Sequence, residues 1–279
     1  MKLHIIETGN FKLDGGAMFG VVPKSLWKRL NVPDENNMCT WSMRCLLIEE
    51  GERKILIDTG LGDKQDEKFR SHFYPHGEDS LERSLNKAGF SFEDITDVFL
   101  THFHFDHVGG AVKRDKNNNL VPTFPNATYW SNDKHYDWAL NPNPREKASF
   151  LKENILPLKE HNVLKYIDVE DGVKFTDSIS VDFVNGHTEA MMVPYIHLEN
   201  GKTLVYTADL LPSHCHIGMP YVMGYDIRPL MTLKEKARLY EKTVNTNHMI
   251  FFEHDKDIAC ANLIKNEKGR VVLGSEIQL

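Results

Sequence analysis

Four side chains that can bind metal ions lie within six residues of one another, in the segment His102-Phe103-His104-Phe105-Asp106-His107. An apolar run, Val98 to Leu100, comes before this segment, and the pair Gly109-Gly110 follows it. In an extended chain, residues two apart project to the same side and are separated by about 6.5 Å, so His102 and His104 can bind one ion. Asp106 continues this alternation, whereas His107 points away unless the chain turns, which the glycine pair allows. The segment predicts a metal site with room for a second ion.

Imidazole and carboxylate ligands suit several divalent metals. We take zinc as the first choice and keep iron, manganese and cobalt as alternatives. A histidine-rich surface turn could contain the same residue types, but this density favours a metal site over that reading.

The segment resembles the H-x-H-x-D-H signature of the metallo-β-lactamase superfamily. Other segments resemble the rest of that family's pattern, in the family's order: Leu56-Ile57-Asp58-Thr59-Gly60, Gly186-His187-Thr188, Thr207-Ala208-Asp209 and Glu253-His254-Asp255. The resemblance spans Asp58 to His254 and implies an α/β fold. In that fold, a four-layer αβ/βα sandwich, two β-sheets pack together with helices outside.

The resemblance also implies a site with two metal ions. Seven side chains would hold them: His102, His104 and His187 on one ion, Asp106, His107 and His254 on the other, and Asp209 on both. Asp58 would hold a ligand histidine by its second ring nitrogen, a contact that sets the tautomer. A hydroxide bridging the ions would attack a lactone or ester carbonyl. Asp106 and Asp209 would be catalytic, with Asp106 moving a proton to the leaving group.

The segment from Gly15 to Pro23 resembles an N-terminal loop in the branch that contains N-acyl-homoserine lactone lactonases and methyl parathion hydrolases. Met18 and Phe19 would then form an apolar pocket wall for an acyl chain or an aromatic ester, although core or dimer contacts would suit them equally. The lactonases carry a tyrosine three residues after the bridging aspartate, and here that position is Pro212. His214 or Tyr225 could supply the missing hydrogen-bond donor.

Three functions follow from these residues. The first is a lactone or ester hydrolase. The second is a phosphotriester or phosphoester hydrolase that uses the same ions. The third is a metal-binding or di-iron redox protein without hydrolytic activity, which histidine at position 107 and the lack of an appended flavin domain disfavour.

The elements that must position these residues are short apolar runs that predict strands. They are Leu3 to Glu7, Cys45 to Glu49, Lys54 to Asp58, Val98 to Thr101, Ile179 to Val184, Pro194 to Leu198, Thr203 to Thr207 and Met249 to Glu253. Each downstream candidate ligand follows such a run, so the ligands should converge at strand ends.

Helical spacing predicts one helix after Asp79-Ser80, ending near Gly89, and another from Leu233 to Val244. Residues 114–125 read as an exposed loop, and Asn141-Pro142-Asn143-Pro144 as a break between two related halves near residue 145. We expect residues 1–279 to form one domain built from these halves.

Composition limits the partners. The chain has 279 residues, a formal net charge of −7 and no run of Lys and Arg, which argues against nucleic acid. It has no apolar stretch long enough to cross a membrane and no apolar core of a signal peptide. Its four cysteines show no C-x-x-C spacing. We therefore expect a cytoplasmic protein that acts on a small molecule, with a homodimer as a possibility.

Overall fold

The computed structural model describes residues 1–279. The chain divides into two compact units, which we describe one at a time. The first unit contains residues 1–10 and 43–169, and the second contains residues 11–42 and 170–279. The strands β1 (Lys2–Asp14) and β2 (Met38–Glu50) are long, and each passes from one unit into the other along the chain.

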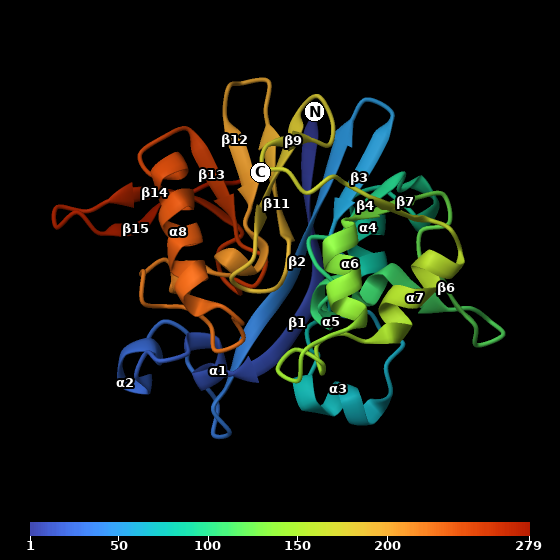
Figure 1. Ribbon diagram of the computed structural model, residues 1–279, viewed down its shortest axis with the longest axis horizontal. Helices are drawn as coiled ribbons and strands as arrows, with labels where there is room; N and C mark the ends of the chain where they lie inside the picture. Colours follow the sequence, from blue (N-terminus) through green and yellow to red (C-terminus); the bar gives the residue numbers. More distant parts are fainter. The chain divides into compact units, whose positions relative to one another are not determined.

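A six-stranded sheet, in the order β1-β2-β3-β4-β7-β8, forms the framework of the first unit (Figure 1). β3 pairs antiparallel with β2, whereas β3, β4, β7 and β8 run parallel to one another. Parallel neighbours place their carboxyl ends at the same sheet edge. The bounds of these strands are Arg53–Ile57 (β3), Asp97–Phe99 (β4), Thr128–Ser131 (β7) and Leu164–Tyr166 (β8).

Helices cover this sheet, and their apolar side chains complete its core. Leu85 of α4, Ala139 of α6 and Ile155 of α7 pack in one cluster with Leu56 of β3 and Val98 of β4. The helices of the first unit are α3 (Glu67–Phe73), α4 (Leu81–Lys87), α5 (Phe105–Val108), α6 (Asp133–Leu140) and α7 (Lys152–Glu160). Short 3₁₀ turns cover Phe92–Asp94 and Gly109–Ala111. A hairpin joins β5 (Val112–Arg114) to β6 (Leu120–Pro122).

The second unit contains a seven-stranded sheet in the order β15-β14-β13-β12-β11-β10-β9. Most neighbours are antiparallel, but β12 and β13 run parallel, so Tyr206 and Phe251 lie side by side where these strands end. The bounds are Val173–Lys174 (β9), Ile179–Val184 (β10), Met191–His197 (β11), Thr203–Tyr206 (β12), His248–Phe251 (β13), Cys260–Lys265 (β14) and Val271–Glu276 (β15).

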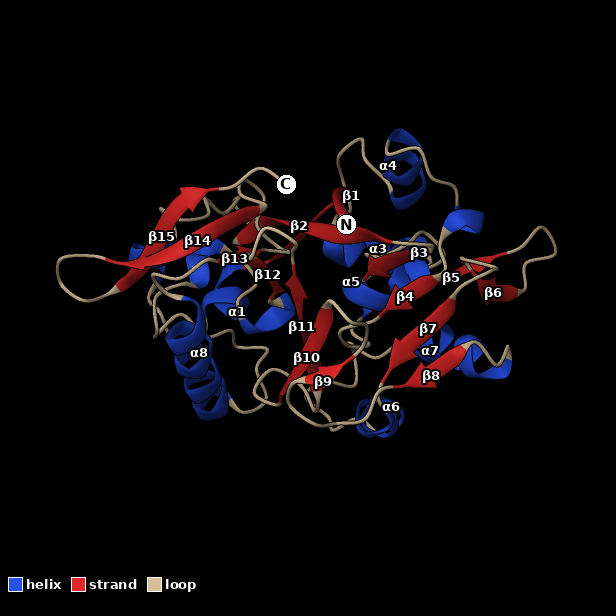
Figure 2. Cartoon of the chain, turned by 90° about the horizontal axis from the view of Figure 1, so that it is seen from above, coloured by secondary structure: helices blue, strands red, loops and turns tan.

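One long helix, α8 (Pro229–Thr243), packs on this sheet (Figures 1 and 2). It begins at Pro229, four residues before the predicted start, because proline suits the first helical position, where its missing N–H costs no hydrogen bond. The unit also contains the short helices α1 (Gly15–Phe19) and α2 (Lys24–Trp27) and 3₁₀ turns at Ala208–Leu210 and His214–His216.

Every predicted strand overlaps a strand of the structure, and α4 follows Ser80 as predicted, with the Ser80 hydroxyl accepting from Arg83 N at 3.3 Å. The prediction of a plain loop over residues 114–125 is wrong in part, because β6 lies inside it. Asp115 organises the turn between β5 and β6, since its carboxylate accepts from Asn117 N and Asn119 N at 2.8 Å.

Besides its two crossings within β1 and β2, the chain passes between the units at Val169–Glu170, and the predicted break near residue 145 lies inside the first unit. Ile155 and Leu158 of α7 explain this position, because they lie after Pro144 and are buried in the core of the first unit. One domain spanning the whole chain stays a prediction.

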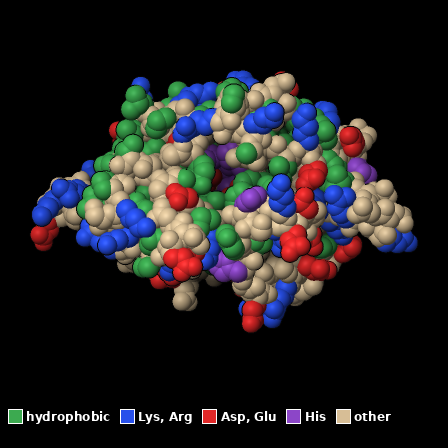
Figure 3. Space-filling model, turned by 90° about the horizontal axis from the view of Figure 1, so that it is seen from below, with side chains coloured by type: hydrophobic (Ala, Val, Ile, Leu, Met, Phe, Trp, Pro, Cys, Tyr) green, Lys and Arg blue, Asp and Glu red, His purple; other side chains and the backbone are tan.

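The surface carries charges of both signs. On the face drawn in Figure 3, Lys and Arg side chains are interspersed with Asp and Glu side chains. All four cysteines are buried, and none forms a disulfide. No helix has the length and apolar character needed to cross a bilayer.

Candidate metal centre

In the first unit, the four candidate ligands lie between the end of β4 and the end of α5, and all four are buried. The segment is extended only as far as His104, since α5 begins at Phe105. This turn brings His107 back beside His102, with ring centroids 4.0 Å apart, and His102 Nε2 lies 3.1 Å from His104 Nδ1. Three imidazoles are therefore gathered in one place.

Asp58, at the end of β3, secures this arrangement. Its carboxylate accepts from Thr101 N at 2.8 Å and from Thr101 Oγ1 at 2.7 Å, and it lies 3.2 Å from His107 Nδ1. Thr59 adds two contacts, because its N and Oγ1 both donate to His107 O at 2.8 Å. With Nδ1 engaged by Asp58, His107 presents Nε2 to a metal.

Asp58 has a φ of 57°, in the left-handed region. This conformation costs a non-glycine residue roughly 1 to 2 kcal/mol. The hydrogen bonds around the carboxylate hold the residue there, as is common where strain serves a functional site.

The structure adds two residues that the sequence analysis did not assign. His135 Nε2 accepts from Phe103 N at 2.8 Å and so fixes the backbone between His102 and His104. Glu146 Oε1 lies 3.7 Å from His104 Nε2. A lone histidine and a glutamate 42 positions after His104 gave no local signal for these roles.

In the second unit, His187, Asp209 and His254 converge, and all three are buried. His187 Nε2 lies 2.9 Å from Asp209 Oδ2, and His254 Nε2 lies 3.1 Å from Asp209 Oδ1. The three residues follow β10, β12 and β13, respectively. The predicted convergence of these three ligands at strand ends is therefore present within this unit.

The other ring nitrogens of both histidines are also engaged. His187 Nδ1 lies 2.9 Å from Asp226 Oδ1, and His254 Nδ1 donates to Ser42 O at 2.7 Å. The backbone before His187 packs closely on α8, because a Cβ on Gly186 would lie 2.3 Å from Thr232 Oγ1. Only glycine fits there.

This donor set fits a divalent cation. Burial by itself would lower the pKa of His187, but the carboxylates of Asp209 and Asp226 on either side of the ring raise it to about 10. The surroundings therefore favour positive charge at this position, which a metal ion supplies. Imidazoles backed by a carboxylate or a carbonyl are the usual ligands of zinc and related metals. The candidate ligands of both units are buried and ligand-competent.

The predicted pocket residues lie in the second unit. Met18 and Phe19 are buried, and the Phe19 ring stacks on Trp27 and on His216, each at a centroid distance of 5.0 Å. Their packing contacts within this unit are those of core residues. Tyr225 is partly exposed, at 37%.

His214 contacts Asp255, the residue that follows His254. Its Nδ1 lies 2.5 Å from Asp255 Oδ2. Pro212 O accepts from His254 N at 2.9 Å, so the residue in the tyrosine position supports a candidate ligand through its backbone.

An aromatic group in the first unit adjoins the ligand segment. Phe105, between His104 and Asp106, contacts Phe69 and Phe73 of α3 at centroid distances of 5.3 and 4.4 Å. We call Phe69, Phe73 and Phe105 the phenylalanine cluster. It places apolar surface beside the candidate metal ligands, and the sequence analysis did not predict it.

Comparison with known proteins identifies the family of this chain. Residues 44–240, more than half of the chain, match the family model described as Metallo-beta-lactamase superfamily. The chain is 25% identical over 266 residues to the N-acyl homoserine lactonase AiiA of Bacillus thuringiensis subsp. kurstaki, covering 91% of this chain and 93% of that protein.

Solved structures are similar over the whole chain. A probable metal-dependent hydrolase from Staphylococcus aureus superposes with a TM-score of 0.87 and 26% identity, covering 99% of this chain and 98% of the other. AidC, described as a dizinc quorum-quenching lactonase, superposes with a TM-score of 0.80 and 24% identity, covering 100% and 97%. The predicted fold class and the prediction of a metallo-hydrolase are confirmed. The chain belongs to the metallo-β-lactamase superfamily.

Proposed function

We propose that this hydrolase acts on lactones or esters with two divalent metal ions, zinc being the first choice, held by the seven side chains predicted from the sequence. One observation carries the proposal: the candidate ligands in each unit are buried histidines and aspartates, and three of the histidines already have a partner for the ring nitrogen that faces away from the site. His107 contacts Asp58, His187 contacts Asp226 and His254 contacts Ser42 O. Such partners are typical of metal-binding imidazoles.

When bound, two such ions supply Lewis acidity and an activated water. The side chains of the protein bind the ions and transfer the proton. Asp209 can bind both ions, because each of its carboxylate oxygens faces a different histidine. Asp106, beside Phe105, can bind a metal and pass a proton to the leaving group.

Two observations favour an acyl substrate. The phenylalanine cluster offers an apolar surface next to Asp106, and the relatives found by sequence include N-acyl homoserine lactonases that match over about nine-tenths of the chain. Pro212 cannot supply the hydroxyl of the lactonase tyrosine, so His214 or Tyr225 would have to donate to the carbonyl oxygen. Phosphotriester hydrolysis on the same site is the second candidate, since the same ions can stabilise a tetrahedral phosphorus centre.

Elemental analysis followed by a substrate panel tests the function. We expect about two equivalents of transition metal per chain and faster hydrolysis of N-acyl-homoserine lactones or aryl esters than of phosphotriesters. Faster phosphotriester turnover would select the second candidate. Two metals with no hydrolysis of any substrate would select a redox or metal-binding role, and protein that holds no metal would refute the site.

Asp106 has a separate test. Replacing Asp106 with Asn should reduce kcat by at least tenfold more for esters with poor leaving groups than for those with good ones, because only poor leaving groups need the proton. Rates for a series of aryl esters of graded phenol pKa would measure this difference. Equal losses across the series would assign Asp106 to metal binding alone.

We place the protein in the cytoplasm, in keeping with four buried cysteines that form no disulfide. Its partner is a small-molecule substrate, with no role for nucleic acid or membrane. Light scattering would decide whether it forms a homodimer.

A further inference from the structure

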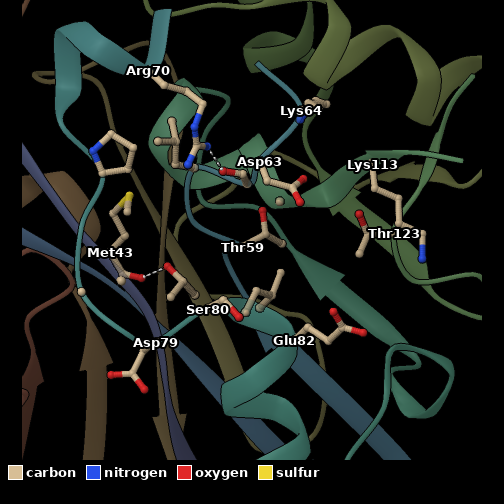
Figure 4. A pocket seen from close by; sticks show the side chains of 18 of the residues that line it. Met43, Thr59, Asp63, Lys64, Arg70, Asp79, Ser80, Glu82, Lys113 and Thr123 are labelled. Atoms are coloured by element: carbon tan, nitrogen blue, oxygen red, sulfur yellow. Dashed lines mark hydrogen bonds between the residues drawn. The ribbon is translucent and has the colours of Figure 1, made fainter. Parts of the chain in front are cut away.

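Two lysines of the chain are buried, and both donate to backbone carbonyl oxygens. Lys64 lies at the wall of a cavity of about 590 Å³ in the first unit and donates to Gly109 O (Figure 4). Lys236 of α8, in the second unit, is 1% exposed and has three acceptors instead of one. Because a lysine is almost never fully buried without partners for its charge, these acceptors replace the water that the ammonium group of Lys236 loses.

The three acceptors of Lys236 belong to one short segment of the chain. Its Nζ donates to His216 O at 2.7 Å, to Gly218 O at 3.0 Å and to Tyr221 O at 3.0 Å. An ammonium group has three N–H donors and no acceptor, so this segment satisfies every donor of Lys236. We call His216 O, Gly218 O and Tyr221 O the carbonyl site.

Burial opposes a positive charge on Lys236, and the carbonyl site favours it. Burial lowers the pKa of Lys236 to about 7. The three carbonyl oxygens act in the opposite direction, because a neutral amine would turn its lone pair towards one of them. Converging backbone carbonyls also replace the hydration shell of monovalent cations in ion-selective sites. The chemistry of the carbonyl site therefore suits a cation better than a neutral group.

The segment that contains the carbonyl site depends on such contacts, because residues 217–228 form no helix or strand. Tyr240, one turn after Lys236 on α8, adds another contact, since its hydroxyl donates to Ile217 O at 2.6 Å. The segment leads to Asp226, whose Oδ1 lies 2.9 Å from Nδ1 of the candidate metal ligand His187. Lys236 thus holds the backbone that brings Asp226 to His187.

We propose that Lys236 is a positioning residue whose ammonium group acts as a built-in cation in the carbonyl site. In this role it holds residues 216–226 in the conformation in which Asp226 supports His187. The link to His187 rests on the proposed function, because it concerns a candidate metal ligand. The carbonyl site does not, and its test needs neither metal nor substrate.

Chemical rescue of the full chain tests the carbonyl site. Lys236→Ala removes the side chain beyond Cβ, and the n-propylammonium ion contains the same carbon and nitrogen atoms. We expect this variant to melt about 5 °C or more below wild type, because hydrogen bonds from a charged donor are lost. Added n-propylammonium should restore at least half of the loss in Tm, whereas 1-propanol, which fills the same space without a charge, should not.

Lys234→Ala removes an exposed lysine of the same helix and is the matched control, with no loss in Tm and no response to either compound. Equal rescue of Lys236→Ala by both compounds, or no rescue by n-propylammonium, would overturn the carbonyl site. If Lys236→Ala does not fold, recovery of the native circular dichroism spectrum with n-propylammonium alone supports the site, and a failure to recover refutes it.

A second variant tests the positioning role. Lys236→Met keeps the length of the side chain but removes the charge, so we expect amide hydrogen exchange in residues 216–226 to become at least tenfold faster and zinc affinity to fall several-fold. Lys234→Met should change neither. Faster exchange with unchanged zinc affinity would refute the positioning role. A wild-type chain that binds no zinc would refute the proposed function and this role together, whereas the rescue experiment would still decide the carbonyl site.

Discussion

In three of the candidate ligand histidines, the two ring nitrogens have different roles. In His107, His187 and His254, Nδ1 contacts Asp58, Asp226 and Ser42 O, respectively. Each contact fixes the ring orientation and leaves Nε2 to bind a metal. Two of the three partners are carboxylates, which make the imidazole a stronger electron donor.

Asp226 allows a test with a single substitution. It contacts the candidate metal ligand His187 but is not itself a predicted metal ligand. Asp226→Asn keeps an oxygen acceptor but removes the charge, so we expect zinc affinity to fall by about 10- to 100-fold. Competition with a chromophoric chelator measures this affinity. Asp177→Asn, at an exposed position of the same unit, is the control. Unchanged affinity in the Asp226 variant would mean that the contact does not tune the metal.

At the scale of elements, parallel strands of the first unit are joined at their amino ends by Asp97. Its carboxylate accepts from Arg53 Nε and Nη2 at 3.0 and 2.7 Å and from Trp130 Nε1 at 2.8 Å, which links β3, β4 and β7. Burial would raise the pKa of Asp97, but hydrogen bonds from Arg53, Thr96 and Trp130 outweigh it and lower the pKa.

Asp97→Asn should therefore destabilise the protein, by about 2 to 3 kcal/mol at pH 7, because hydrogen bonds to a charged acceptor are lost. A carboxyl with a lowered folded-state pKa stabilises the fold above its unfolded pKa of roughly 4, and this contribution disappears as the pH falls through the folded value. The difference from wild type should thus narrow below about pH 4. Urea unfolding at several pH values measures it, with exposed Asp137→Asn as the control. A difference that persists undiminished at pH 2.5 would contradict this account.

At the scale of the whole molecule, the candidate ligands belong to both units and span the chain from His102 to His254. A metal that binds the folded chain stabilises it by mass action, by about 4 kcal/mol when the free metal is at 1,000 times its Kd. For a chain of this length, that free energy corresponds to on the order of 10 °C in Tm.

Chelation should therefore lower Tm by about this amount, and adding zinc back should restore it. Differential scanning calorimetry of protein with and without chelator gives the shift. His254→Gln should abolish most of the chelator effect, whereas His248→Gln should keep it, because His248 belongs to no candidate ligand set. A His254 variant that responds to the chelator like wild type would remove His254 from the site.

The sequence by itself predicted the strand runs, the first helix boundary at Ser80 and a metal site in the His-x-His-x-Asp-His segment. These features depend on alternation, capping and spacing over a few residues, which the local chain encodes directly. The full set of seven candidate ligands, with His187, Asp209 and His254, was implied by the resemblance to the metallo-β-lactamase superfamily, and it stays a prediction. The sequence did not predict α3, because this helix has no buried residue and so lacks the apolar periodicity that signals a helix.

Only the tertiary structure gave the other partners of those ligands, since Asp58 was the one partner that the resemblance implied. Asp226 lies 39 residues after His187, Ser42 lies 212 residues before His254, and Phe69 and Phe73 reach Phe105 from another helix. It also placed the change of unit at Val169–Glu170, after α7 had joined the first core. Such contacts depend on how whole elements pack, and no local pattern of residue types records which distant side chain the packing will bring into reach.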